Sequence, residues 1–99
     1  MVKVIWTERA LKDLEDIGNY IAQDSPKYAG RTLEKIISIA GLIESNPYMG
    51  RIVPELNDQL IREFIRGNYR IIYQIRENAT FILTVFHSAR YLSEKELHF

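Results

Sequence analysis

The sequence contains no cysteine, which excludes disulfide bonds and metal sites built from thiolates. Its two histidines, His87 and His98, are too few for a histidine-rich metal site, and we predict no cofactor. Apolar runs are only a few residues long, whereas a membrane-spanning helix needs roughly 20. No signal peptide precedes the first apolar segment, which begins at Val2. We therefore expect a cytoplasmic protein without membrane contact.

Net charge is also absent, because 13 basic residues balance 13 acidic residues, so no general attraction to nucleic acid is expected. The charges are nevertheless unevenly distributed along the chain. Lysine is missing between Lys35 and Lys95, and every basic residue from Arg51 to Arg90 is an arginine. The first predicted helix is acidic instead, so one face of a neutral molecule can be basic.

The remaining composition is that of a folded protein, since 46% of the residues are hydrophobic and 26% are charged. Ninety-nine residues are enough for one modest hydrophobic core but not for two. We therefore predict a single domain over residues 1–99. Trp6, Tyr20 and Tyr28 are expected to pack in or around that core.

Two stretches have the periodicity of amphipathic helices. The first follows the N-cap residue Thr7 and should end near Gln23 or Asp24. The second begins at Ser25-Pro26, a cap followed by proline at the first helical position, and should end before Asn46-Pro47. The residues expected to face the core are Ala10, Leu14, Ile17 and Ile21, then Ala29, Leu33, Ile36, Ile37, Ala40 and Ile43. The tight link predicts a helical hairpin that packs on a sheet.

Four segments predict β-strands, at residues 2–6, 61–66, 69–75 and 80–87. Gly67-Asn68 fits a two-residue hairpin turn, and a short strand at 51–53 is expected within the loop from 46 to 60. The last strand is strongly apolar and should be central. The order β-α-α-β-β-β predicts an α+β fold, in which the N-terminal helical hairpin packs on a small antiparallel sheet.

Four short motifs cover most of the chain. They are W-T-x-x-A-x-x-D-L at residues 6–14, G-R-I-V-P-E-L at 50–56, R-E-x5-Y-R-I-I-Y at 62–73 and V-F-H-S-A-R-Y-L at 85–92. In this order they resemble the motifs of the RelE/ParE superfamily of toxins from type II toxin–antitoxin systems. The last motif resembles the ending of the ParE-like branch.

This resemblance implies a growth-inhibiting toxin, of a kind linked to plasmid stabilisation, that a cognate antitoxin encoded beside it holds inactive in a hetero-oligomer. Two targets are known in the superfamily: RelE-like members cut mRNA on the ribosome, and ParE-like members poison DNA gyrase. The 85–92 motif and the missing lysines favour a ParE-like toxin that binds gyrase. The alternatives are a metal-independent mRNA endonuclease, so enzymatic activity stays open, and a binding module that has lost its toxicity and only represses its own operon.

The nuclease alternative needs a base for the ribose 2′-OH, cations for the phosphorane and an acid for the leaving oxygen. The site of RelE resembles one built from lysines, and this chain has no lysine between Lys35 and Lys95. Other nuclease members use a glutamate, an arginine and a histidine, and the residues that resemble this set are Glu55, Arg70 and His87. Residues expected to bind the target or its phosphates are Arg51, Arg62, Arg66, Arg90 and Tyr91.

Each catalytic candidate also has a structural interpretation. Glu55 can be a solvated loop acid, and Arg70 can pair with Glu63 on the neighbouring strand. His87 alternates with Val85 and Leu83 along an apolar strand, where a lone histidine is often a hydrogen-bonded structural residue.

Overall fold

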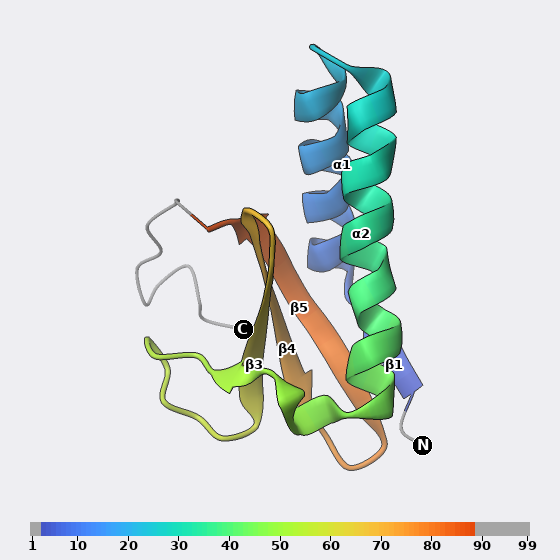
Figure 1. The fold of residues 1–99 in the computed structure, drawn as a ribbon. Helices are drawn as coiled ribbons and strands as arrows, with labels where there is room; N and C mark the ends of the chain where they lie inside the picture. Colours follow the sequence, from blue (N-terminus) through green and yellow to red (C-terminus); the bar gives the residue numbers. More distant parts are fainter. Residues whose placement is uncertain (1–2, 89–99) are drawn as a thin grey trace.

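The structure is a computed structural model, and it describes residues 3–88 of the chain. The elements are β1 (Lys3–Trp6), α1 (Glu8–Ala22), α2 (Pro26–Ser45), the short 3-10 helix η1 (Pro47–Met49), β2 (Arg51–Ile52), β3 (Ile61–Arg66), β4 (Tyr69–Ile75) and β5 (Ala79–His87). The predicted α+β order is confirmed, with two antiparallel helices followed by a sheet (Figure 1). Within residues 3–88, no helix is both long enough and apolar enough to cross a membrane.

The five strands form one sheet in the order β1-β5-β4-β3-β2. Strands β2 to β5 pair antiparallel, and the Gly67-Asn68 turn joins β3 to β4 as predicted. Strand β1, however, pairs parallel with β5, so the sheet is mixed and not purely antiparallel. A parallel neighbour requires a long crossover, and the chain between β1 and β5 provides one because it contains every other element. The apolar strand β5 lies inside the sheet, as its composition predicted.

The helices pack on one face of the sheet and bury the main core there. That core consists of Ala10, Leu14, Ile36, Ile39 and Ile43 from the helices and Ile71, Tyr73, Ile75, Ile82 and Val85 from the strands. The expected stripe on α2 was wrong at one position, because Ile39 is fully buried whereas the side chain of Ile37 is 49% exposed. Ile36, Ile39 and Ile43 are spaced by three and four residues and therefore share one helix face.

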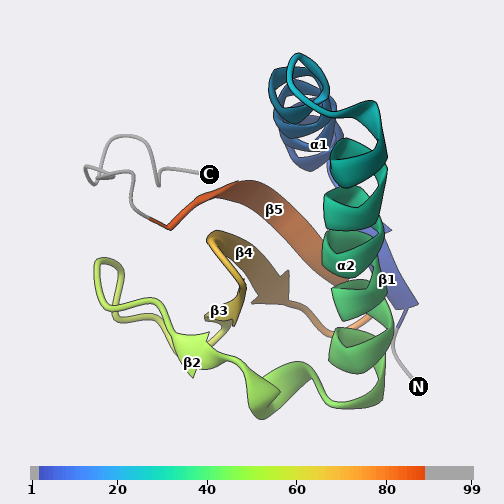
Figure 2. The ribbon, with the colours of Figure 1, turned by 45° about the horizontal axis from the view of Figure 1, so that its top comes forward.

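The opposite face of the sheet carries a smaller apolar group, the second cluster, made of Val53, Ile72, Leu83 and Phe86. The β2–β3 loop lies at the β2 edge of the sheet, far from α1 (Figure 2). The register between β4 and β5 shifts between Ile72 and Tyr73 and leaves Leu83 as an extra residue. Leu83 and Val85 therefore face opposite sides of the sheet. The expectation that His87 shares a face with both residues holds for Val85 and was wrong for Leu83.

Two polar side chains tie α1 to the edge of β5 where β1 has ended. The Thr7 hydroxyl donates to the Ile82 carbonyl at 2.7 Å. The Asp13 carboxylate accepts from the Val85 backbone N–H at 3.0 Å and also from the Thr84 hydroxyl. An open strand edge needs such partners, because unpaired backbone groups are costly when buried. The T and D of the W-T-x-x-A-x-x-D-L motif thus join the helix to the sheet.

Replacement of Asp13 tests this role. Asp13→Ala should lower the free energy of unfolding by about 1–3 kcal/mol, because a backbone N–H and a hydroxyl lose their acceptor. The control is Asp16→Ala on the same helix, which removes only an exposed pair with Lys12 and should cost less than about 0.5 kcal/mol. Urea unfolding followed by circular dichroism measures both values. Equal losses in the two variants would contradict the edge-capping role.

Candidate functional site

A buried carboxylate connects strands β2, β3 and β4 on the face of the second cluster. Glu63 pairs with Arg51 across β2–β3, and its side chain is completely buried. One oxygen of Glu63 accepts from Nε of Arg51, and the other accepts from Nε of Arg70 at 2.6 Å. The interpretation of Arg70 as a cross-strand partner of Glu63 therefore agrees with the geometry.

Arg70 uses its outer edge to hold the loop after β2. Its two terminal nitrogens donate to the two oxygens of Glu55 at 3.1 and 3.2 Å, and its guanidinium carbon lies 5.1 Å from the Phe86 ring centroid. Every nitrogen of the guanidinium therefore has a carboxylate partner. Two sequence candidates, Glu55 and Arg70, are thus brought into direct contact.

The ionisation of this pair follows from the contact. Hydrogen bonds from Arg70 hold the pKa of Glu55 below its ordinary value, against the opposing effect of burial. Burial by itself would lower the pKa of Arg70, but the hydrogen bonds to Glu55 and Glu63 outweigh it and raise the pKa. Glu55 is therefore a paired carboxylate at neutral pH and not a base with a raised pKa.

His87 lies on the other face of the sheet. It pairs in register with Tyr69, and the two rings meet edge to face with centroids 5.5 Å apart. Tyr69 packs against the main core, whereas Arg70 stacks on Phe86 of the second cluster. Successive residues of a strand point to opposite faces, so the structure brings Glu55 to Arg70 but separates His87 from both.

The other arginine candidates differ in their surroundings. Arg62 donates to the Gln59 and Gly50 carbonyls at 2.8 and 3.1 Å and stacks on Tyr48, so it fastens the loops that flank β2. Arg51 extends towards solvent but keeps its Nε on Glu63. Arg90 and Tyr91 lie outside the described residues.

The loop motif and the Y-R-I-I-Y motif meet at Gly50. The buried Tyr73 hydroxyl donates to the Pro47 carbonyl at 2.7 Å and accepts from the Gly50 N–H at 3.0 Å. Burial raises the pKa of Tyr73, so the phenol stays protonated and can donate. A side chain at Gly50 would place its Cβ 2.4 Å from this hydroxyl and 2.6 Å from the Glu63 carbonyl. The motif glycine is therefore a steric requirement.

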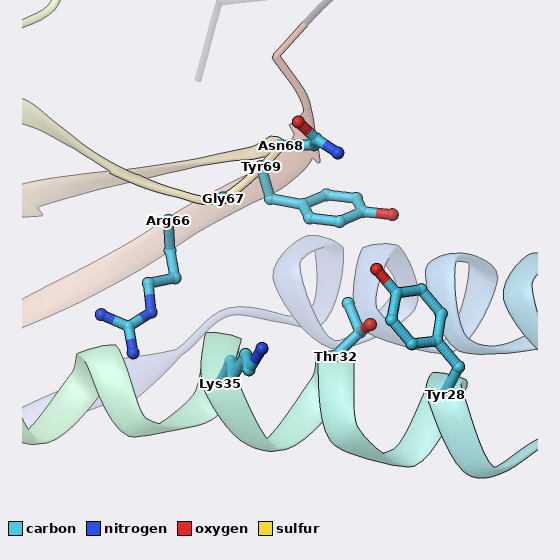
Figure 3. Close-up of a pocket in the computed structure, with 7 residues that line it drawn as sticks. All are labelled: Tyr28, Thr32, Lys35, Arg66, Gly67, Asn68 and Tyr69. Atoms are coloured by element: carbon cyan, nitrogen blue, oxygen red, sulfur yellow. The ribbon is translucent and has the colours of Figure 1, made fainter.

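The last candidate, Arg66, lines a groove of about 420 Å³ between α2 and the tip of the β3–β4 hairpin. We call this feature the hairpin groove, and its lining residues are Tyr28, Thr32, Lys35, Arg66, Gly67, Asn68 and Tyr69 (Figure 3). Sequence reasoning missed its helical wall. We expected Trp6, Tyr20 and Tyr28 to pack in or around the core. This holds for Trp6, but Tyr28 and Tyr20 are 59% and 74% exposed, so the expectation was wrong for them. The i, i+4, i+7 spacing of Tyr28, Thr32 and Lys35 was the available signal.

Comparison with known proteins identifies the family. Residues 4–92 match the model described as the ParE toxin of the type II toxin-antitoxin system, parDE. The chain belongs to the ParE toxin family. Membership shows that it is a type II system toxin of the RelE/ParE superfamily, as the motifs suggested, and it implies a cognate antitoxin.

Individual relatives of this ParE-family toxin carry names from both branches. It is 32% identical to Toxin RelE2 of Caulobacter vibrioides over 90 residues, which are 91% of this chain and 99% of that protein. It is 33% identical to Y4kP of Sinorhizobium fredii over 88 residues, 87% of this chain and 88% of the other. A chain of the chromosomal ParDE TA system from P. aeruginosa has the same fold, with a TM-score of 0.72 at 19% identity, covering 88% of this chain and 96% of that one.

The close approach at Gly50 predicts an asymmetry between two glycines. Gly50→Ala should destabilise the ParE-family toxin by about 1–3 kcal/mol, because the new methyl group collides with a buried hydroxyl and with backbone. Gly41→Ala is the control, since it adds the same methyl group on the exposed face of α2 with no atom within 4 Å. It should stabilise the helix by up to about 1 kcal/mol. Thermal unfolding of both variants gives the sign of each change, and a stabilising Gly50→Ala would refute the steric requirement.

The ion pair at Glu55 predicts a pH dependence. Because the pKa of Glu55 is below its ordinary value of 4.5, its stabilisation is present above that value and is lost as the pH falls through the lowered one. Glu55→Gln should therefore cost up to about 1 kcal/mol at pH 7 and almost nothing in strong acid. Urea unfolding of both proteins between neutral and acidic pH tests this. A cost independent of pH would mean that the charge of Glu55 is not what matters.

Proposed function

We propose that this toxin inhibits growth by binding its target and not by cutting RNA, with DNA gyrase as that target and the cognate antitoxin as its neutralising partner. The observation that carries the proposal is the separation of His87 from the Glu55–Arg70 pair across the sheet. General acid–base cleavage requires its groups within hydrogen-bond reach of one phosphate. Two groups on opposite faces of a sheet do not meet that requirement.

The engagement of Arg70 also supports binding over catalysis. A phosphate held by its terminal nitrogens would first have to displace the two oxygens of Glu55. Glu63, which is buried, would keep the inner side of the guanidinium in place. The charged residues Glu63 and Arg70 of the 62–73 motif therefore have a structural role, because they hold each other and Glu55 in place.

One alternative remains of interest, a RelE-like endonuclease that acts on mRNA at the ribosome. The name of the relative Toxin RelE2 and the contact between an ionised Glu55 and Arg70 favour it. In that case Glu55 would have to release Arg70 in order to serve as the base. The two functions therefore differ in their dependence on Glu55, Arg70 and His87.

Induction of the chain without its antitoxin separates the two functions. We expect filamentation and a DNA damage response with intact transcripts, and purified gyrase should accumulate cleaved DNA complexes when the toxin is added. Transcripts cut within ribosome-bound regions would support the endonuclease instead. Normal growth despite soluble, folded protein would contradict both and leave a chain that only binds its antitoxin.

Single substitutions sharpen this test. His87→Ala and Glu55→Gln should retain full toxicity, because neither residue acts in a cleavage reaction under the proposal. Loss of a general acid or base lowers a catalysed rate by about 10²–10⁴-fold, so an endonuclease would lose its toxicity in both variants. The Gly41→Ala variant serves as a folded control with an unrelated change. Titrated induction followed by growth curves measures the dose at which each variant arrests growth.

A further inference from the structure

The hairpin groove has a basic end and a tyrosine end. Arg66 extends from the hairpin towards α2, where Lys35 lies, and the hydroxyl groups of Tyr28 and Tyr69 lie near each other further along (Figure 3). Three lining residues come from one face of α2, and four come consecutively from the β3–β4 turn. The groove is therefore formed by two elements that are far apart in the sequence.

The two cations at the basic end form no ion pair within the part of the chain that the structure describes. Among residues 3–88, no acidic residue lines the groove, and neither Lys35 nor Arg66 has a salt-bridge partner. The arginines of the opposite face differ, since Arg51 and Arg70 are neutralised by glutamates. In a chain with no net charge, the hairpin groove is thus a locally positive surface suited to an anion.

The other end of the groove offers amphipathic aromatic surface. Burial raises the pKa of Tyr69, and the neighbouring phenols of Tyr28 and Tyr20 add to that effect. Tyrosine and arginine are enriched at the centres of protein interfaces, where the ring buries apolar area and the hydroxyl keeps a hydrogen bond. A volume of about 420 Å³ accommodates several side chains of a peptide.

These features favour a peptide over a nucleic acid. Affinity for nucleic acid comes largely from many Lys and Arg contacts to phosphates, about 6–10 in a strong binder, and the groove supplies two cations. Helix α1, which packs beside α2, carries four acidic and two basic residues, and its net negative charge disfavours a long polyanion. A peptide with a single carboxylate among apolar side chains fits both ends of the groove, because the carboxylate complements the basic end and the apolar side chains complement the tyrosine end.

We propose that the hairpin groove receives an acidic side chain of the antitoxin, whose carboxylate is bound by Lys35 and Arg66 while Tyr28 and Tyr69 contact the apolar residues beside it. This inference rests on the proposed function only in requiring a cognate antitoxin. It names the chemistry of the antitoxin anchor, an Asp or Glu flanked by apolar residues, and the toxin residues that select it.

Zero-length crosslinking of the toxin–antitoxin complex tests the carboxylate contact directly. A carbodiimide activates a carboxylate as an O-acylisourea, and an adjacent lysine Nζ attacks the acyl carbon to form an amide while the carbodiimide leaves as its urea. Mass spectrometry should identify a crosslink between Lys35 and an acidic residue of the antitoxin encoded beside the toxin. Lys27 provides the internal control, because it is exposed on α2 but does not line the groove. Crosslinks at Lys27 with none at Lys35 would overturn the proposal.

Affinity measurements with matched double variants provide the second test. Lys35→Ala/Arg66→Ala should weaken antitoxin binding by about 10–100-fold, mostly through faster dissociation, because a desolvated charge contact is lost. Lys27→Ala/Arg31→Ala removes one lysine and one arginine from exposed positions of the same helix and should change Kd by less than about threefold. Equal effects of the two variants would indicate only a long-range charge effect and would contradict the groove contact.

The outcomes separate this inference from the proposed function. If the toxin poisons gyrase and the Lys35→Ala/Arg66→Ala variant binds the antitoxin as tightly as the unchanged toxin does, the groove contact is refuted and the proposed function stands. A toxin that the antitoxin does not bind refutes the pairing itself. A 12-nucleotide single-stranded RNA serves as a third probe. If its affinity depends on Lys35 and Arg66 and that of the antitoxin does not, the groove belongs to RNA and the proposal fails.

Discussion

The pairing of the buried Glu63 carboxylate is the interaction that holds β2, β3, β4 and the loop after β2 together. A fully buried carboxylate costs several kcal/mol unless its oxygens are paired, and here arginines from β2 and β4 supply donors to both. The contact with Glu63 fixes the position of Arg70, and Arg70 in turn binds Glu55 in the loop after β2. The ends of β2 and the loop around Glu55 are therefore positioned by one side chain on β3. Two of the three catalytic candidates from the sequence, Glu55 and Arg70, therefore belong to a structural ion-pair network, and His87 lies outside it.

That network leaves the two faces of the sheet with different electrostatic character. On the face of the second cluster, arginine charges are compensated by glutamates within the fold. On the helix side, Lys35 and Arg66 line the hairpin groove from its two walls, with no carboxylate among the lining residues that the structure describes. The first face is suited to holding the fold together, and the second is suited to a partner that brings negative charge. This division explains how a chain with equal numbers of basic and acidic residues keeps a basic recognition surface.

The relatives show why the fold by itself does not assign the target. A ParE family model and a protein named Toxin RelE2 both align with nearly the whole chain, and the ParDE toxin structure shares the architecture at only 19% identity. One scaffold thus carries members that are named for different activities, and function depends on the side chains placed on it. In this chain, the proposal of a toxin that acts by binding rests on the placement of His87 on the sheet face opposite Glu55 and Arg70.

The sequence by itself determined the features that arise from neighbouring residues. The caps at Thr7 and Ser25-Pro26, the turn at Gly67-Asn68 and the strand alternation in β4 were all predictable, because each depends on backbone geometry within a few residues. Only the tertiary structure decided the parallel pairing of β1 with β5, the extra residue Leu83 that separates the faces of β5, and the groove that joins Tyr28 and Lys35 to Arg66. These features depend on contacts between residues far apart in the chain, and a local pattern contains no information about which distant element will supply the partner. The pairing of Arg70 with Glu63 lies between the two cases, since adjacent strands made it foreseeable, while the bidentate contact with Glu55 required the loop to fold back across the sheet.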